Sequence, residues 1–453
     1  MCKRTFFVAK ILAVVAVAFA TDARAQGASL SDFWAELGDP TLRALVNEAL
    51  SSNLDVRAAE ARVREAGANR RLAFHDFFPT VTASSGYRRQ RFSGSSFPGL
   101  TQASDLELYD AGVDASWEVD LFGRIRRNVS GQTALVRASF EDVRDVQVLL
   151  ASEVGRTYYE LRGAQEQLAV AQRNAENQRR TLDLTEVRLE GGRGTAFDTE
   201  RARAQLSTTL ATIPALETRI SAAIFRIGVL LGRPPAALAD SLMAPAEYPD
   251  LPADPRIDDP DAIVRQRPDV RAAERRHAAE TAFVGSARAE YLPRLSVGGN
   301  AGFTSTSFDG FGDSEASRYV VGPTLSWPLF DLGRVRARVS AAEARAAEAR
   351  AGYDFSVLTA LEEAELALVS YERSRAQLTH LSDAAAASER AAELARLRFD
   401  EGVTDFLQVL DAERTLLEAQ DRLAQGRTNA INALVELYRA LGGAWPLGEP
   451  GAP

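Results

Sequence analysis

Residues 109–121 read Tyr-Asp-Ala-Gly-Val-Asp-Ala-Ser-Trp-Glu-Val-Asp-Leu, and this stretch decides the fold class. Every odd position is apolar, while the even positions carry aspartate, glycine, serine or glutamate. Alternation with a period of two predicts a strand with one apolar and one polar face. Aromatic residues, Tyr109 and Trp117, stand near the two ends of the apolar face. Eight steps of about 3.3 Å, tilted by about 40°, make an apolar band roughly 20 Å tall.

Two kinds of protein contain such a strand. An outer-membrane β-barrel has an apolar band about 25 Å tall between two aromatic girdles, with a polar interior. A soluble β-sandwich has a comparable strand whose polar face meets solvent. The strand alone does not decide between them.

The rest of the chain favours the barrel, because the pattern recurs. Residues 319–329 alternate in the same way, with aromatic residues at Tyr319 and Trp327. Residues 81–92 and 294–306 provide a partner strand before each, joined by loops at 93–107 and 307–317. Four strands are too few to enclose a lumen, for which about eight is the usual minimum. Open sheet edges cannot face lipid, so we expect a barrel assembled from several chains.

The recurrence extends over nearly the whole chain. Asp55-Val56-Arg57 matches Asp269-Val270-Arg271, an offset of 214 (269 − 55). From Ser116-Trp117 and Ser326-Trp327 onward the offset is 210 (326 − 116). A period this long means two copies of one large unit rather than a short-repeat solenoid.

Helical patterns surround the strands in both copies. Residues 40–77 have apolar residues at steps of three and four, and Pro79 ends that run. The stretches 124–189 and 334–399 lack proline and are rich in Ala, Glu, Arg and Leu, which predicts two helices of roughly 100 Å. Such a composition is also typical of a fibrous coiled coil, but a fibre does not need the strands that precede each helix.

Each long helix is expected to end at a glycine turn and to be followed by a return helix, at 196–231 and 404–441. The run Gly191-Gly192-Arg193-Gly194 resembles a phosphate-binding loop in composition. It follows a helix rather than a strand and lacks the lysine spacing, so we interpret it as a turn between antiparallel helices. Between the copies, the proline-rich residues 233–262 predict a linker.

The N-terminus predicts a secretory signal. Lys3, Arg4 and Lys10 are basic, residues 11–20 are apolar, and Ala23-Arg24-Ala25 offers a cleavage site. Ten apolar residues are too few to span a bilayer, which takes about 20, and we expect no transmembrane helix. Removal of the signal takes away a net charge of +3, so −9 becomes −12 (−9 − 3), and this acidity argues against nucleic acid as a partner. Cys2, the only cysteine, is lost with the signal, so no disulfide is expected.

No catalytic or metal-binding pattern is found. The three histidines have no metal-site spacing, and the sequence contains no G-x-S-x-G, H-E-x-x-H or phosphate-loop motif. Asp309-Gly310-Phe311-Gly312-Asp313 could hold a cation, although a solvated loop tip explains it better. The sequence predicts neither an enzyme nor a cofactor or metal.

Several motifs together resemble the outer-membrane efflux protein family, the TolC/OprM-like factors, and within it the NodT-type subgroup. In the first copy they are Phe33-Trp34, residues 37–42 (Leu-Gly-Asp-Pro-Thr-Leu) and residues 116–124 (Ser-Trp-Glu-Val-Asp-Leu-Phe-Gly-Arg). In the second copy they are residues 267–270, 327–331, 410–413 and 437–443. Many members of the subgroup have a lipidated cysteine after the signal. Here Gln26-Gly27-Ala28 has none, so anchorage should rest on the barrel alone.

The resemblance implies a mostly α fold with a membrane β-barrel segment: a two-repeat TolC-like fold in a homotrimer. Four strands per chain complete a twelve-stranded barrel, and the helices form a long periplasmic α-helical barrel. It further implies an exit duct in the Gram-negative outer membrane. In a tripartite pump this duct works with a periplasmic adaptor and an inner-membrane transporter of RND type. The alternative is a trimeric coiled-coil structural or surface protein without transport, which would give no unitary conductance. A passive duct needs no selective pocket, so the sequence names no substrate.

The expected divisions of the chain follow the repeats. They are a signal peptide (1–25), an N-terminal equatorial segment and helix (26–78), a first barrel hairpin (79–122), a first helical hairpin (123–232), an equatorial linker (233–265), a helix (266–292), a second barrel hairpin (293–330), a second helical hairpin (331–441) and a tail (442–453).

Site residues are also implied by the resemblance. The adaptor should meet the two helical turns, made of Gly191, Gly192, Arg193, Gly194 and Thr195 in the first copy and of Gly402, Val403 and Thr404 in the second. In the family a glycine followed by an apolar residue docks onto the adaptor, and Gly402-Val403 fits that pair.

A periplasmic gate is expected on the return helix of the second copy. Leu407 and Asp411 are four residues apart, so they share one helix face. Asp411 matches the position of an acidic ring in the family, and Leu407 matches the adjoining apolar constriction. Gln408 occupies a position that is acidic in some members. A single acidic ring is therefore expected. The alternative is that Asp411 pairs with Arg414 on a solvated face. Asp421 is a distant control position for tests of the gate.

Overall fold

The computed structural model describes residues 33–34, 37–92, 104–244, 248–249, 251 and 264–443. The chain divides into two compact units, and each takes segments from both halves of the sequence. The helical unit comprises residues 1–59, 143–270 and 357–453, and the strand unit comprises residues 60–142 and 271–356. The predicted signal peptide, most of the loop at 93–107, much of the linker and nearly all of the tail lie outside the described residues.

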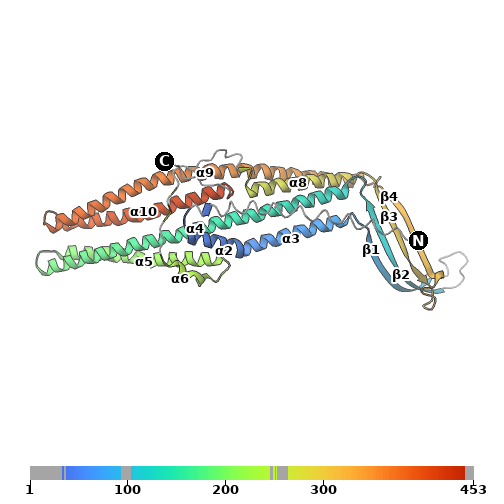
Figure 1. Cartoon of the computed structure of the whole chain (residues 1–453), viewed down its shortest axis with the longest axis horizontal. Helices are drawn as coiled ribbons and strands as arrows, with labels where there is room; N and C mark the ends of the chain where they lie inside the picture. Colours follow the sequence, from blue (N-terminus) through green and yellow to red (C-terminus); the bar gives the residue numbers. More distant parts are fainter. Residues whose placement is uncertain are drawn as a thin grey trace, which may run out of the picture. The chain divides into compact units, whose positions relative to one another are not determined.

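The strand unit contains one four-stranded antiparallel sheet, in the order β1-β2-β3-β4 (Figure 1). The strands are β1 (Thr80–Phe92), β2 (Ser104–Val119), β3 (Arg294–Ser305) and β4 (Ser317–Ser326). The four strands predicted from the alternating pattern are confirmed. β2 begins earlier than the alternation indicated, and β4 ends one residue before Trp327. Pairing of β2 with β3 joins the two copies into a single sheet.

The register puts all odd-numbered strand residues on one face. Val113 lies opposite Ala83 and Ala301, and Ala301 lies opposite Tyr319. From the Tyr87–Tyr109 pair to the strand ends near Trp117 this face is mostly apolar, and it is exposed: Tyr319 has 81% of its surface accessible. Large exposed apolar surfaces mark interaction or membrane sites.

The even-numbered residues form the polar face, which carries a hydrogen-bonded network across three strands. Arg318 of β4 donates to Asp110 of β2 (2.7 Å) and to Thr304 and Asn300 of β3 (2.7 and 2.9 Å). Gly302 of β3 lies opposite Gly112 of β2. A Cβ on Gly302 would stand 2.3 Å from a carbonyl oxygen of β2. Only glycine permits this approach of the two backbones.

Each strand pair is tied to the helix before it by a tryptophan. The indole of Trp117 donates to the carbonyl of Phe77 (2.8 Å), after helix α3 (Leu54–His75). In the second copy Trp327 donates to the carbonyl of Tyr291 (3.0 Å), after helix α8 (Pro268–Ala289). The two bonds are equivalent under the sequence repeat, so both copies make the same junction.

The helix predicted at 40–77 is two helices, which corrects that expectation. α2 (Pro40–Ser52) ends at Asn53, whose backbone is extended, and α3 begins at Leu54. The Asn53 side chain accepts from the backbone N–H groups of Asp55 (2.7 Å) and Val56 (3.2 Å). It also donates to the carbonyl of Leu230 (2.8 Å). Asn53 therefore caps α3, as asparagine favours, and the helical periodicity continues across the break.

The longest elements are two helical hairpins, as predicted. α4 (Arg124–Glu190) is followed by α5 (Ala196–Leu230), and α9 (Leu332–Asp400) by α10 (Phe406–Ala440) (Figure 1). Short helices η1 (Pro235–Leu238) and α6 (Ala239–Leu242) lie at the start of the linker, and η2 (Ser314–Ala316) precedes β4. Within the described residues no single helix is long and apolar enough to cross a membrane, although the sharply bent pair Ala196–Leu230 and Pro235–Leu242 satisfies length and composition together.

The helical unit has an aromatic core around Phe33 and Trp34. Phe33 stacks on Tyr438 at 4.1 Å between ring centroids, and Trp34 meets the same ring edge-on at 5.2 Å. Gly155 of α4 leaves room for Trp34, because a Cβ there would stand 2.5 Å from the indole. Tyr158 donates to Asp39 (2.5 Å), which caps α2. The pKa of Tyr158 is raised to about 12, mainly because the residue is buried and secondly because of this hydrogen bond.

Candidate functional site at the helical turns

The turns after α4 and α9 have the same backbone conformation. Gly192 and Gly402 have φ of 69° and 74°. The N–H of Arg193 donates to the carbonyl of Arg188, and that of Val403 to the carbonyl of Arg398, each at 2.8 Å. This pattern is a Schellman cap, which needs a left-handed residue and therefore favours glycine. The interpretation as tight turns is confirmed.

Each return helix begins with a side-chain cap. Thr195 Oγ1 accepts from the backbone N–H of Asp198 (3.1 Å) at the start of α5. Asp405 Oδ1 accepts from that of Gln408 (3.2 Å) at the start of α10. Under the repeat, Asp405 is the counterpart of Thr195 (405 − 195 = 210). The sequence analysis placed the start of α10 at Thr404 and missed Asp405, although an aspartate before a helix is a recognised cap signal.

The tips of the turns are accessible. Val403 has 63% of its surface exposed, and Arg193 is also exposed. Within the part of the chain that the structure describes, and apart from the adjoining residues, no heavy atom lies within 4 Å of an ideal Cβ on Gly192 or Gly402. The turn of the second copy thus presents an apolar side chain beside open space.

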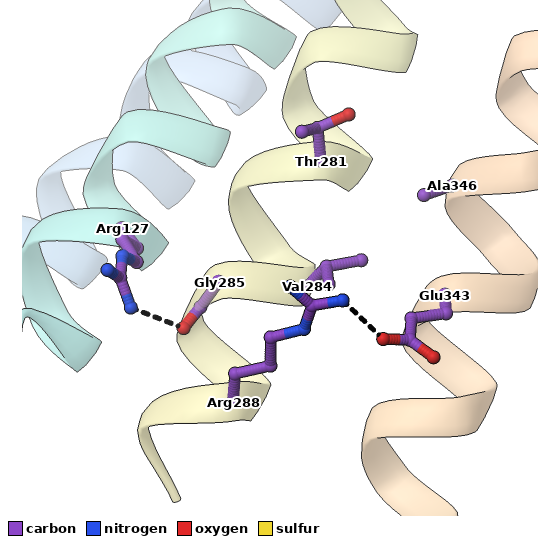
Figure 2. A pocket seen from close by; sticks show the side chains of 7 residues that line it. All are labelled: Arg127, Thr281, Val284, Gly285, Arg288, Glu343 and Ala346. Carbon is purple, nitrogen blue, oxygen red and sulfur yellow. Dashed lines mark hydrogen bonds and ion pairs between the residues drawn. The ribbon is translucent and has the colours of Figure 1, made fainter.

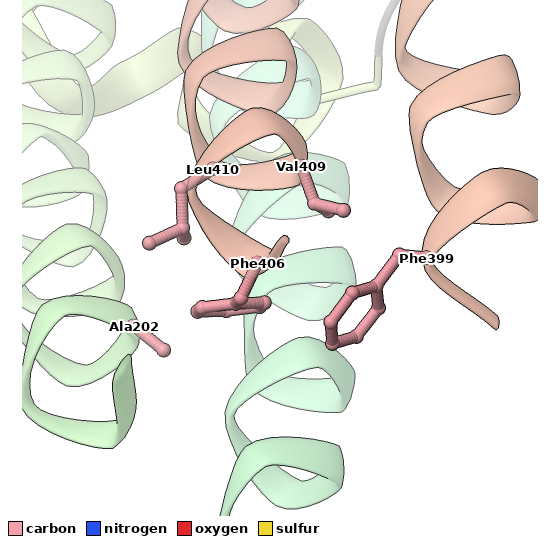
Figure 3. Close-up of a cluster of buried hydrophobic side chains, with 5 residues drawn as sticks. All are labelled: Ala202, Phe399, Phe406, Val409 and Leu410. Carbon is pink, nitrogen blue, oxygen red and sulfur yellow. The ribbon is translucent and has the colours of Figure 1, made fainter. Parts of the chain in front are cut away.

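An apolar cluster lies directly below the turns. It consists of Ala202 of α5, Phe399 of α9, and Phe406, Val409 and Leu410 of α10 (Figure 3). The rings of Phe399 and Phe406 are 5.4 Å apart. The Arg188 guanidinium of α4 lies 3.9 Å from the centre of the Phe399 ring. The cluster therefore joins both hairpins near their turns.

The predicted gate residues lie on the other side of α10 from this cluster. Leu407, Gln408 and Asp411 are all exposed, whereas Phe406, Val409 and Leu410 are buried. Leu407 and Asp411 share an exposed face, as their spacing indicated. Asp411 accepts from Arg414 at 2.8 Å, which is the contact foreseen as the alternative to a ring. In a single chain the side chain is both paired and largely exposed.

Asp421 is not the neutral control position that the sequence indicated. Its carboxylate accepts from Gln167 of α4 at 2.6 Å and from Gln425 at 2.7 Å. Asp354 of α9 is a better match for Asp411, because it is exposed and pairs with Arg350 at 3.0 Å.

Sequence reasoning missed a buried carboxylate one turn beyond the cluster. Glu413 of α10 is 2% exposed. Its Oε1 accepts from Arg396 of α9 (2.9 Å) and from Thr181 of α4 (3.2 Å). Its Oε2 is buried and has no hydrogen-bond partner within the described part of the chain. A charged residue in a helix of mixed composition gives no sequence signal of burial.

Thr181 and Glu413 begin a series of polar contacts between α4 and α10. The next pairs are Asn174 with Gln420 (3.0 Å) and Gln167 with Asp421 (2.6 Å). We call these six residues the polar seam. Gln167, Asn174 and Thr181 are spaced by seven residues (174 − 167 and 181 − 174), the spacing of a coiled-coil contact position. Beside the seam, a cavity of about 200 Å³ is lined by residues that include Arg180, Thr181 and Arg396.

The predicted interface aromatics lie on or next to the apolar face of the sheet. Tyr109 and Tyr319 are in β2 and β4, and Tyr109 packs against Tyr87 of β1 at 5.0 Å. Trp117 and Trp327 are at the other end of these strands and remain partly exposed. The two ends of the apolar face therefore carry aromatic side chains, as expected.

A second hollow lies between helices of the strand unit (Figure 2). Arg127 of α4 donates to the carbonyl of Gly285 of α8 (2.9 Å), and Arg288 of α8 pairs with Glu343 of α9 (2.6 Å). A Cβ on Gly285 would stand 2.6 Å from the Arg127 side chain. These contacts connect three helices, so we interpret the hollow as a packing feature. The described residues contain no group of three potential metal ligands.

The chain is similar to known proteins in both its sequence and its fold. The family model described as Outer membrane efflux protein matches residues 45–233 and 260–443. Outer membrane protein OprJ of Pseudomonas aeruginosa is 32% identical over 430 residues, which cover 94% of this chain and 89% of OprJ. Nodulation protein T of Rhizobium leguminosarum bv. trifolii is 28% identical over 413 residues, which cover 90% of this chain and 86% of Nodulation protein T. Among solved structures, the outer-membrane channel OprN has a TM-score of 0.86 at 42% identity, covering 92% of this chain and 93% of that chain.

Proposed function

The chain belongs to the outer membrane efflux protein family, and from this premise we propose how its two units form the exit channel of a tripartite pump. It has the TolC-like fold and is an efflux component of the outer membrane that extends into the periplasm. The observation that carries the proposal is the two-faced sheet: an apolar face bounded by aromatics and a polar face with Asp110, Asp114 and Arg318.

The working channel is a homotrimer. The sheet has two open edges, β1 and β4, and lipid does not tolerate unpaired strand edges. Three sheets joined edge to edge give twelve strands, enough to surround a lumen. The odd-numbered face then meets lipid, and Tyr109, Trp117, Tyr319 and Trp327 lie at its interfaces.

The helical turns dock a periplasmic adaptor. Gly402 and Val403 offer an exposed apolar side chain beside free space, and Gly192 forms the same turn in the first copy. Through the adaptor the channel receives its cargo from an inner-membrane transporter of RND type. The exposed backbone of the turns suits partners that insert a hairpin between neighbouring tips.

The exposed face of α10 forms the periplasmic gate. Three copies of Leu407 would narrow the pore, and three copies of Asp411 would gather negative charge at one level. Like charges repel and together attract divalent cations. The pairing of Asp411 with Arg414 is exposed, and such pairs are weak because water screens them, so the carboxylate can turn toward an axis.

Growth on toxic compounds tests the transport function. Deletion of the gene should raise sensitivity to part of a panel of drugs and metals, and a plasmid with the full chain should restore resistance. A variant that lacks residues 109–121 should fail to restore it, because it has lost the central strand. If the deletion strain keeps normal resistance to the whole panel even when other efflux channels are also removed, the proposal is wrong.

A further inference from the structure

The apolar face of the sheet changes character beyond the Tyr87–Tyr109 pair. Toward the opposite end of the strands this face carries alanine, valine and tryptophan. Beyond the tyrosines, Arg89 lies opposite Glu107 and Arg91 opposite Asp105. Among the described strand residues these four are the only charged ones on the odd-numbered face. We call them the outer charge cluster.

The cluster is open to its surroundings. The side chains of Arg89 and Arg91 are 61% and 71% exposed. Arg89 contacts Asp105 at 3.2 Å and Glu107 at 3.8 Å, and Arg91 contacts Asp105 at 3.8 Å. Exposed pairs of this kind contribute little, because water screens them. A phosphate can therefore replace a carboxylate at little cost.

The cluster belongs to one hairpin only. In the second hairpin the pair equivalent to Arg89 and Glu107 under the repeat is Phe303 of β3 and Ser317 of β4, which lie opposite each other and carry no charge. A solvated strand end would need no such difference between the copies. In a trimer the arrangement gives three separate charged patches.

We propose that the outer charge cluster binds the phosphorylated head groups of lipids in the outer leaflet of the outer membrane. This rests on the proposed orientation of the barrel, in which the apolar face meets lipid. Aromatic girdles mark the level of the membrane interface, so charges just beyond Tyr87 and Tyr109 lie at head-group level. Planar guanidinium groups bind phosphate oxygens in a forked geometry. The two carboxylates hold the arginines on the outward face until lipid arrives.

Binding of diphosphorylated lipid A to the purified full-length protein in detergent tests the proposal. Replacing both arginines, Arg89→Ala with Arg91→Ala, should weaken binding about thirtyfold, the effect of two arginines near an anionic lipid surface. Arg89→Lys with Arg91→Lys keeps the charge but loses the forked contact, so it should bind more weakly than the wild type and more tightly than the Ala variant. Arg179→Ala is the matched control, because Arg179 also forms one exposed pair, with Glu176 at 3.0 Å.

Dephosphorylated lipid A and inorganic phosphate distinguish the sources of the phosphate. The wild-type protein should bind dephosphorylated lipid A weakly, and millimolar phosphate should not displace the intact lipid. Equal lipid A binding by the Ala variant and the wild type would overturn the inference, and so would displacement by free phosphate. Drug resistance measured on the same variants separates this inference from the proposed function: we expect the Ala variant to lose lipid and keep efflux.

Discussion

Helix α4 contributes to two buried contacts of opposite character. In its middle part, Tyr158 and Gly155 take part in the aromatic core around Trp34 and Tyr438. Nearer the turn, its contacts with α10 include the polar seam, to which it contributes the buried Gln167 and Asn174 and the partly buried Thr181. Apolar burial contributes about 25 cal/mol per Å², whereas one internal hydrogen bond contributes about 0.5–1.5 kcal/mol net.

The difference indicates which part of the helical unit is fixed and which part can open. Separation of the polar seam exposes groups that water can satisfy, so it costs little. Separation of the aromatic core exposes large rings. The gate proposed on α10 needs this division, because its tip must move while its base stays assembled.

Loss of the aromatic core should have the largest effect on stability. Trp34→Ala leaves a cavity against Tyr438 and should lower the free energy of unfolding by about 3–5 kcal/mol. Denaturant unfolding in detergent, followed by circular dichroism of the helices, measures it. Phe197→Ala is the control, because Phe197 is 67% exposed and should change stability by less than about 0.5 kcal/mol. Equal effects of the two variants would contradict the role of the core.

Obstruction of the turn should abolish efflux without unfolding the protein. In Gly402→Trp a bulky side chain fills the docking space, at a backbone strain of about 1–2 kcal/mol. Resistance of a complemented strain is the readout, with trimer formation checked by cross-linking. Gly38→Trp is the matched control for Gly402→Trp. Gly38 also has a positive φ, 72°, and among the described residues no heavy atom beyond its neighbours lies within 4 Å of its Cβ position. Normal resistance of the Gly402 variant would argue against adaptor docking here.

Two substitutions, one at Glu413 of the seam and one at its ion-pair partner Arg396, should act in opposite directions. Arg396→Ala leaves the buried carboxylate of Glu413 without its cation, which destabilises by about 3–5 kcal/mol in buried pairs. We expect a looser tip and leakage of large antibiotics into the cell. Glu413→Leu removes the charge and fills its volume, a change that is often neutral or stabilising by about 1–4 kcal/mol. The remaining Arg396 is 36% exposed and stays hydrated.

The readouts for the seam are thermal stability and sensitivity to a large antibiotic. Arg396→Ala should lower the thermal stability and raise the sensitivity to the antibiotic. Glu413→Leu should hold the tip closed and reduce efflux. If both variants shift leakage in the same direction, the seam does not control opening.

A smaller effect is expected from alkaline pH. Because folding raises the pKa of Tyr158 from 10 to about 12, the folded state holds a proton that the unfolded state loses. The resulting stability is complete below pH 10 and is lost as the pH rises toward 12. Unfolding midpoints across that range should fall less steeply for Tyr158→Phe than for the wild type. Identical slopes would contradict the pKa assignment.

The features that follow a period were predictable from the sequence. The four strands, the long helices, the glycine turns and the two-copy organisation all follow from alternation, composition and self-similarity. Asn53 was not predicted as a cap because it interrupts a helix without changing its apolar spacing, whereas Asp405 carried a cap signal that the periodicity alone did not use. Glu413 escaped because its burial depends on Arg396 and Thr181, which are distant in the sequence. The two-faced character of β2 was evident, but its pairing with β3 needed the three-dimensional register.

Single-channel recording of the purified protein in a planar bilayer tests the gated channel most directly. The wild type should show a small unitary conductance that divalent cations block from the periplasmic side. Asp411→Ala should raise the conductance and weaken the block, while Asp354→Ala, in its similar exposed pair, should change neither. If Asp411→Ala conducts and is blocked like the wild type, the acidic gate is absent, and if the wild type shows no unitary conductance at all, the chain is not a channel.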